Sequence, residues 1–201
     1  RAYNPAAAAG SGTFDSFVRI SANTEVVQGY NTDARPVEFD ENTSPSFTRS
    51  YRLSNIPIVN DADYPGVYRE FQLDINQTLG NAIYSLEEVE VYLTTDSNLF
   101  GYPFGGSAER VYQLDKVGDD PDGDNWVKLN YELAAGSGKR DMTLRIPNAN
   151  FLASDLGADP TCVYAGAPPA GDSCNTYVVL YSKFGENLLN DDGYEEWGVE
   201  L

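Results

Sequence analysis

The stretch Val67–Leu93, VYREFQLDINQTLGNAIYSLEEVEVYL, decides the predicted fold of this chain. Its apolar residues alternate with polar ones in two runs: Phe71, Leu73 and Ile75, then Val89, Val91 and Leu93. A repeat of two is typical of strands with one buried face, so we expect two strands with carboxylates turned toward water. Leu86 and Val89 are three residues apart, so in a regular strand they would face opposite sides. For both to face the core, a β-bulge or a single helical turn is needed at Ser85–Glu88.

Further strand patterns follow along the chain, separated by turn-like segments. They are Thr13–Ile20, Thr24–Gln28, Phe47–Leu53, Arg110–Leu114, Trp126–Leu133, Arg140–Ile146, Thr176–Phe184 and Tyr194–Leu201. Thr176–Phe184 is nearly apolar on both faces, as in a central strand. Val127, Leu129, Tyr131 and Leu133 are expected to share an inward face, and Asn55–Gly66, with two prolines, is expected to be a loop. The pattern predicts an all-β chain: a two-sheet antiparallel β-sandwich, jelly-roll-like, with an N-terminal arm.

The chain divides into two expected parts, residues 1–28 as an N-terminal arm and residues 29–201 as a single β-sandwich domain. An exposed arm can add as a strand to the open edge of a neighbouring sheet. We expect its apolar side chains to make the subunit contact, namely Phe14, Phe17, Val18 and Ile20. The alternative is an ordinary first strand in the sheet of its own chain.

Composition disfavours several classes of function. The formal net charge of −18 disfavours nucleic acid, because phosphates would be repelled. No apolar run approaches the roughly 20 residues of a membrane helix, so we expect no membrane insertion. Histidine is absent, which removes the usual general base of serine and cysteine triads and the commonest zinc ligand. We therefore expect a protein that is not an enzyme.

The two cysteines, Cys162 and Cys174, lie in one segment rich in glycine, proline and alanine. We expect a disulfide between them, which would stabilise the fold by roughly 3 kcal/mol in the chain-entropy model. Two free thiols are the alternative. A disulfide indicates an oxidising, extracytoplasmic compartment.

Clustered acidic residues make calcium the expected cofactor, because hard cations take six to eight oxygen ligands. The candidate ligands are Asp119, Asp120, Asp122 and Asp124 in one loop, Asp191 and Asp192 in a second turn, and Asp74 and Asn76 on one strand face. The first loop does not match an EF-hand, since its acids are too tightly clustered. The alternative is that these acids are solvated surface charge.

Several runs together resemble a known group of proteins. They are EFQLDINQ (70–77), YSLEEVEVYL (84–93), VYQLD (111–115), DNWVKLNYELAAGSGKRDMTLRIPN (124–148), YVVLYSKFGEN (177–187) and DDGYEEWGVEL (191–201). Their order and spacing resemble secreted bacterial surface and matrix proteins that carry a PEP-CTERM sorting tail. The resemblance implies export and a surface or matrix role. That tail is not found before Leu201, so we expect a released subunit.

These patterns predict an extracellular or cell-surface structural subunit of a filament or biofilm matrix. It is expected to form a homopolymer through its arm, with calcium neutralising acidic loops. The first alternative is a monomeric adhesion domain that binds surface glycans through exposed aromatic residues, with Tyr92, Phe100, Tyr102 and Phe104 as candidates. The second is a glycosidase using a carboxylate pair such as Glu88 and Glu90.

Overall fold

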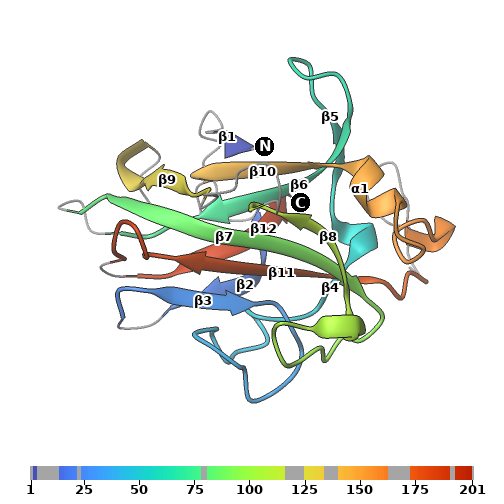
Figure 1. The fold of residues 1–201 in the computed structure, drawn as a ribbon, viewed down its shortest axis with the longest axis horizontal. Coiled ribbons are helices and arrows are strands. Elements are labelled where there is room, and N and C mark those ends of the chain that lie inside the picture. Colours follow the sequence, from blue (N-terminus) through green and yellow to red (C-terminus); the bar gives the residue numbers. More distant parts are fainter. Residues whose placement is uncertain are drawn as a thin grey trace.

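The computed structural model describes the backbone of residues 2–3 and residues 14–21, 24–77, 81–115, 125–133, 140–162, 173–190 and 193–200. These residues form two antiparallel sheets packed against one another (Figure 1). The apolar rows of both sheets meet in one core cluster between the layers. The predicted all-β sandwich is therefore confirmed.

Each sheet has six strands. Sheet A has the order β1 (Ala2–Tyr3), β10 (Met142–Pro147), β6 (Val67–Asp74), β12 (Glu195–Glu200) and β2 (Phe14–Ile20), with β5 (Ile58–Asn60) also pairing with β6. Sheet B has the order β3 (Val27–Tyr30), β11 (Tyr177–Phe184), β7 (Ile83–Thr94) and β8 (Glu109–Gln113), with β4 (Tyr51–Arg52) on β11 and β9 (Val127–Asn130) on β7.

The main strands pair in a nested pattern. The first pairs with the last (β2 with β12), the next with the next to last (β3 with β11), and the innermost pairs are β6 with β10 and β7 with β8. The pairings of β12 with β6 and of β11 with β7 then join these ribbons into the two sheets. This is the pairing of a jelly roll, in which one long antiparallel ribbon wraps into a sandwich.

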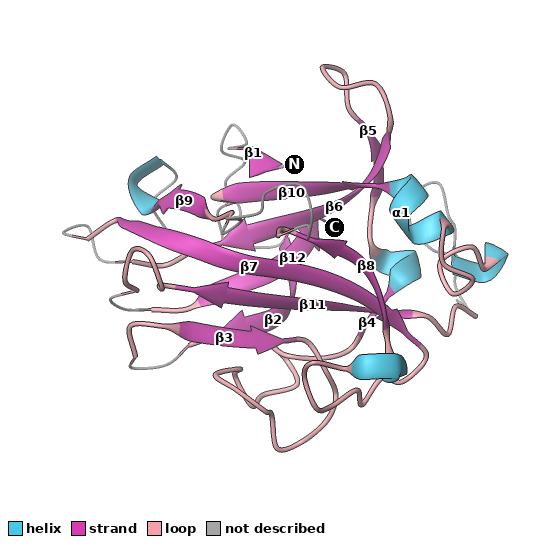
Figure 2. Cartoon of the chain, in the orientation of Figure 1, coloured by secondary structure: helices cyan, strands magenta, loops and turns pink. Residues whose placement is uncertain are grey.

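Helices are short and lie at the margins of the sandwich (Figure 2). The α-helix α1 covers Asn148–Leu152, and single 3₁₀ turns cover Leu53–Asn55, Gly105–Ser107, Tyr131–Leu133 and Pro160–Cys162. They join strands and take no part in either sheet.

The two apolar rows of the opening stretch lie in the core, as predicted. Phe71, Leu73 and Ile75 are fully buried, and Val91 and Leu93 are as well. Leu73 lies opposite Met142 on one side and opposite Trp197 on the other, because β6 is central in sheet A.

The bulge predicted at Ser85–Glu88 is confirmed at Glu87. Lys183 lies opposite Glu88 while Phe184 lies opposite Leu86, so Glu87 has no residue across from it on β11. Its carboxylate accepts hydrogen bonds from the Ser85 hydroxyl and from the backbone N–H of Asn187. The extra residue lets Leu86 and Val89 both face inward despite their parity.

The expectation that the polar face of β6 meets water is wrong. Glu70, Gln72 and Asp74 are only 6%, 1% and 2% exposed. Because β6 has partners on both sides, neighbouring side chains close over it: Arg145 of β10 pairs with Glu70 at 2.7 Å. An alternating pattern reports the two faces of a strand but not what covers the second face.

Three local predictions also differ from the structure. Only Tyr51–Arg52 of Phe47–Leu53 is a strand, since the amides of Phe47 and Thr48 close a turn on Ser44. The expected loop Asn55–Gly66 contains β5, which starts directly after Pro57, where a missing N–H costs an edge strand little. Leu133 is 62% exposed, because the chain turns into a 3₁₀ helix after β9.

Candidate functional site

The first 20 residues supply the strands at both ends of the main strand order of sheet A. β1 lies on one edge, where Ala2 and Tyr3 pair with Leu144 and Thr143 of β10. β2 lies on the opposite edge and pairs with β12. We call residues 1–20 the edge segment. Figure 1 labels β1 and β2, and the strands β10, β6 and β12 lie between them in the order of the sheet.

The predicted contact residues lie in β2. Phe17, Val18 and Ile20 are fully buried against the core of their own chain, and Phe14 is partly buried. Phe17 is an extra residue in the pairing with β12, because Trp197 lies opposite Val18 and Gly198 lies opposite Ser16. The bulge explains how the adjacent residues Phe17 and Val18 are both buried. A contact of these side chains with a neighbouring subunit stays a prediction.

A short connection joins β2 of sheet A to β3 of sheet B. We call residues 21–26 the hinge; Ala22 and Asn23 lie outside the described residues. The Ser21 hydroxyl donates to the carbonyl of Gly193 at 2.9 Å, and the N–H of Asn190 donates to the carbonyl of Glu25 at 3.0 Å. The turn between β11 and β12 therefore holds the hinge at both ends.

A glycine is required where this turn meets the hinge. Gly185 has φ of +91°, and a Cβ built on it would lie 2.0 Å from the carbonyl oxygen of Glu25. Both its backbone conformation and its close approach exclude a side chain. Beside it lies a cavity of about 540 Å³, lined by Glu25, Asn81, Ile83, Leu188, Leu189 and Asn190.

Behind the hinge, the carboxyl group of Glu195 is enclosed in the end of the sandwich. The residue is fully buried and lies opposite Ile20, the last residue of β2. The Gln77 amide donates to Oε1 of Glu195 at 3.4 Å and also to Oδ1 of Asn190. The Tyr84 hydroxyl faces the same carboxyl group as a further hydrogen-bond donor. Burial raises the pKa of Glu195 to about 8.

The surroundings of Glu195 are acidic as well. The Tyr84 hydroxyl is also fully buried; it donates toward Glu195 and lies near the charges of Asp141 and Asp74. Burial and these carboxylates raise the pKa of Tyr84 well above its usual value. Burial is the cause that favours a neutral Glu195, and the hydrogen bonds from Tyr84 and Gln77 oppose it.

Most of the predicted calcium ligands lie outside the described residues, namely Asp119, Asp120, Asp122, Asp124, Asp191 and Asp192. Asp74 and Asn76 are described, at the end of β6. The backbone carbonyl of Asn76 packs against Gly193. Within the described ranges, no three His, Cys, Asp or Glu side chains form a metal-binding group.

The aromatic residues considered for glycan binding mostly belong to a second core on the outer face of sheet B. Tyr92 and Phe104 are 6% and 4% exposed and contact each other edge to face, whereas Phe100 is 54% exposed. The Tyr102 ring stacks on Tyr181 with centroids 4.0 Å apart. Sequence alone could not separate buried rings from exposed ones in this loop, because no periodicity applies outside a strand.

Glu88 and Glu90 lie on that same outer face, and both have partners. Glu90 accepts from the hydroxyls of Tyr92 and Tyr102 and pairs with Arg110. Glu88 faces Lys183 at 3.6 Å, and burial raises its pKa. The two carboxylates border a cavity of about 130 Å³ with Val89, Gln113, Leu114 and Asp115.

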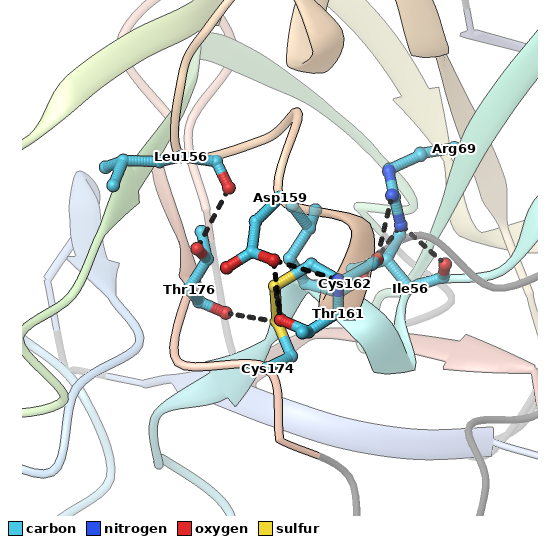
Figure 3. The surroundings of a disulfide bond; sticks show 9 residues. Ile56, Arg69, Leu156, Asp159, Thr161, Cys162, Cys174 and Thr176 are labelled. Atoms are coloured by element: carbon cyan, nitrogen blue, oxygen red, sulfur yellow. Dashed lines mark hydrogen bonds between the residues drawn. A yellow bond between two sulfur atoms is a disulfide. The ribbon is translucent and has the colours of Figure 1, made fainter.

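The predicted disulfide is present and joins Cys162 to Cys174. Both cysteines are fully buried. Figure 3 shows the hydrogen bonds around the bridge: Asp159 accepts from the amide and hydroxyl of Thr161, and the Thr176 hydroxyl donates to the Leu156 carbonyl. The bridge therefore fastens the connection between α1 and β11 to the body.

Arg69, which no sequence pattern singled out, lies beside this bridge (Figure 3). It is 1% exposed, and its guanidinium donates to the carbonyls of Leu53, Ile56 and Cys162 and to Oδ1 of Asn148. Burial lowers the pKa of Arg69 to about 10. No carboxylate of the described residues forms an ion pair with it. Arg69 lies two residues before Phe71 and so shares its inward face, and only the fold reveals the acceptors that a buried guanidinium needs there.

No family model matches the chain, and neither a curated protein nor a solved structure matches it significantly. Within its described residues, the chain contains no helix with the length and apolar character needed to cross a membrane.

Proposed function

We propose that this chain is an extracellular structural subunit that assembles into a homopolymer by placing its edge segment in a neighbouring subunit. The observation that carries the proposal is the origin, in the first 20 residues, of the strands at both ends of the main strand order of sheet A. If a neighbour supplied these strands, each subunit would both donate and receive the same element. Such a head-to-tail exchange adds one subunit after another and forms a filament, unless the rotation between neighbours closes it into a ring.

The energetics favour exchange over simple release. Burying Phe17, Val18 and Ile20 stabilises the sheet by about 1.5–3 kcal/mol for each side chain. A subunit that lost β2 without replacement would expose this groove and the edge of β12. Exchange with an identical neighbour restores every contact, so its cost lies mainly in the hinge and in the entropy of association.

The reach of the segment is sufficient for a second subunit. Residues 4–13 join β1 to β2, and ten extended residues span up to about 33 Å. Crossing the sheet from one edge to the other needs about 19 Å at the usual strand spacing. On the other edge, the described residues of β1 pair with Leu144 and Thr143 of β10.

The extracellular setting rests on the disulfide, which favours an oxidising compartment, and on the resemblance to exported matrix proteins. Calcium is part of the proposal as the cation that neutralises the acidic loops. Neither the assembly of subunits nor the extracellular location requires a catalytic reaction.

Mixing two chains that each carry one added cysteine beside the native disulfide tests the exchange. Arg19 of β2 lies opposite Glu196 of β12, so Arg19→Cys in one chain and Glu196→Cys in another can form a disulfide only across an exchanged pair. We expect linked dimers on a non-reducing denaturing gel. The matched control mixes Glu88→Cys with Lys183→Cys, an ion-paired cross-strand pair within the body. Equal linking in both mixtures would contradict exchange.

A second candidate is glycan binding on the outer face of sheet B. It is favoured by the cavity bordered by Glu88, Glu90, Gln113 and Asp115, because carboxylates and amides bind sugar hydroxyls and the Tyr102 ring lies nearby. A glycan array would test it. Binding that survives Glu88→Gln together with Gln113→Ala would contradict this site.

A further inference from the structure

Two edge strands lie side by side on one side of the sandwich. β2 ends the main strand order of sheet A and β3 ends that of sheet B, and the two strands lie next to one another (Figure 1). An edge strand presents backbone N–H and C=O groups to which a strand of another chain can add. In this protein residues 39–49, which we call the strap, lie along both strands and bind these groups.

On β2, the strap binds backbone carbonyls of the outer edge. The N–H of Asn42 donates to the Arg19 carbonyl at 2.8 Å, and the N–H of Arg49 donates to the Phe17 carbonyl at 3.0 Å. The guanidinium carbon of Arg19 lies 3.5 Å from the centre of the Phe47 ring, so a side-chain contact fastens the strap to β2 as well. An incoming strand would find these carbonyls of β2 already bonded.

Asp40 joins the two edges, and Glu41 completes the cover of β3. The N–H of Asp40 donates to the Gln28 carbonyl at 3.1 Å, and its own carbonyl accepts from the N–H of Ser21 at 2.9 Å. The Asp40 carboxylate accepts from the N–H of Gln28 at 3.0 Å. Glu41 is only 5% exposed and accepts from the N–H of Tyr30 at 2.9 Å. These two carboxylates take the place of a neighbouring strand's carbonyls on the edge of β3.

Glu41 fits closely against Gly29 of β3. A Cβ built on Gly29 would lie 2.6 Å from Cγ of Glu41, closer than real Cβ atoms approach. Glu41 has little freedom to give way, because it is buried and its second carboxylate oxygen accepts from the N–H of Phe39 at 2.8 Å. A side chain at position 29 would therefore displace the strap from β3.

We propose that the strap is an autoinhibitory contact, which keeps a second copy of this chain from adding to the edges of β2 and β3. A second copy is the partner that fits, because two identical edges can pair with each other antiparallel about a two-fold axis. β2 has 7 residues and β3 has 4, which is long enough for such pairing. The strap thereby confines assembly to other surfaces of the sandwich. It acts independently of the exchange of the edge segment, since it closes on β2 in the same way whichever subunit supplies that strand.

Replacing Gly29 opens the strap without changing any residue of the strap itself. We expect Gly29→Ala to speed amide hydrogen exchange at the Tyr30 N–H by about tenfold or more, because its acceptor on Glu41 is displaced. The same variant should self-associate at a concentration about tenfold lower than the unchanged protein needs, as measured by sedimentation velocity. The matched control is Gly106→Ala, since a Cβ at Gly106 meets nothing within 4 Å. It should match the unchanged protein in both measurements.

Two further variants complete the test. Glu41→Ala removes the acceptor without adding a side chain to β3, so it opens the strap even where Gly29→Ala does not fold. Adding Gln28→Pro to an opened variant removes a backbone N–H that faces the strap, and the extra association should disappear. Association that persists with Gln28→Pro would overturn the proposal, as would faster exchange at Tyr30 without extra association, or unchanged exchange in both opened variants. All these chains keep the edge segment, so a failure of its exchange leaves this comparison intact and is detected by the mixed-cysteine experiment.

Discussion

At the scale of single residues, Arg69 illustrates how a buried charge can be stabilised without an opposite charge. Its guanidinium offers five donors in a fixed fork and uses them on three carbonyls and one side-chain amide. The acceptors come from three segments that lie far apart in the chain. Arg69 therefore ties β6 to the 3₁₀ turn at Leu53 and to the cysteine loop.

We predict that Arg69→Leu lowers the free energy of unfolding by about 3 kcal/mol or more, because it leaves several buried carbonyls without donors. Arg69→Lys should lower the free energy of unfolding by less than Arg69→Leu does, because its single ammonium group reaches some of the acceptors but not all of them. Urea unfolding measures both. Arg110→Leu is the control: its side chain is 44% exposed, so its pair with Glu90 should contribute below about 1 kcal/mol. Equal losses at the two positions would contradict the proposed role of Arg69.

At the scale of elements, β6 determines the register of sheet A. Its pairing with β10 and β12 places the row of Phe71, Leu73 and Ile75 against the core, and a shift by one residue would bring Gln72 and Asp74 inward instead. The buried polar row on its outer face adds a second constraint, because Glu70 must meet Arg145.

We predict that Leu73→Asp prevents folding, because a carboxylate without a partner would replace a fully buried side chain between two strands. Circular dichroism and thermal unfolding would detect the loss. Val67→Asp is the matched control on the same strand, where the side chain is 47% exposed, and it should fold. A native-like Leu73→Asp protein would refute the register.

At the scale of the whole molecule, the net charge of −18 opposes both folding and association. We predict that removing calcium with EGTA lowers the melting temperature and reduces assembly, because Asp119, Asp120, Asp122 and Asp124 would then repel one another. Sodium chloride at equal ionic strength is the control for simple screening. Unchanged melting and assembly in EGTA would remove calcium from the proposal.

The sequence by itself determined most of the long strands and the apolar rows that they bury. Periodicity placed Phe71, Leu73 and Ile75 in the core, parity located the bulge at Glu87, and the spacing of the cysteines identified their bridge. These features depend on neighbouring residues along the chain, so a local pattern is enough to predict them.

Only the tertiary structure decided which strands pair and what covers their outer faces. β2 pairs with β12 across almost the whole length of the chain, and no local pattern encodes that choice. The same holds for the acceptors of Arg69, the partners of Glu90 and the enclosure of Glu195, which lie on different strands or loops. Burial of a polar side chain depends on distant residues that fold over it. The charged residues of β6 were therefore expected to face water, whereas the structure buries them under other side chains.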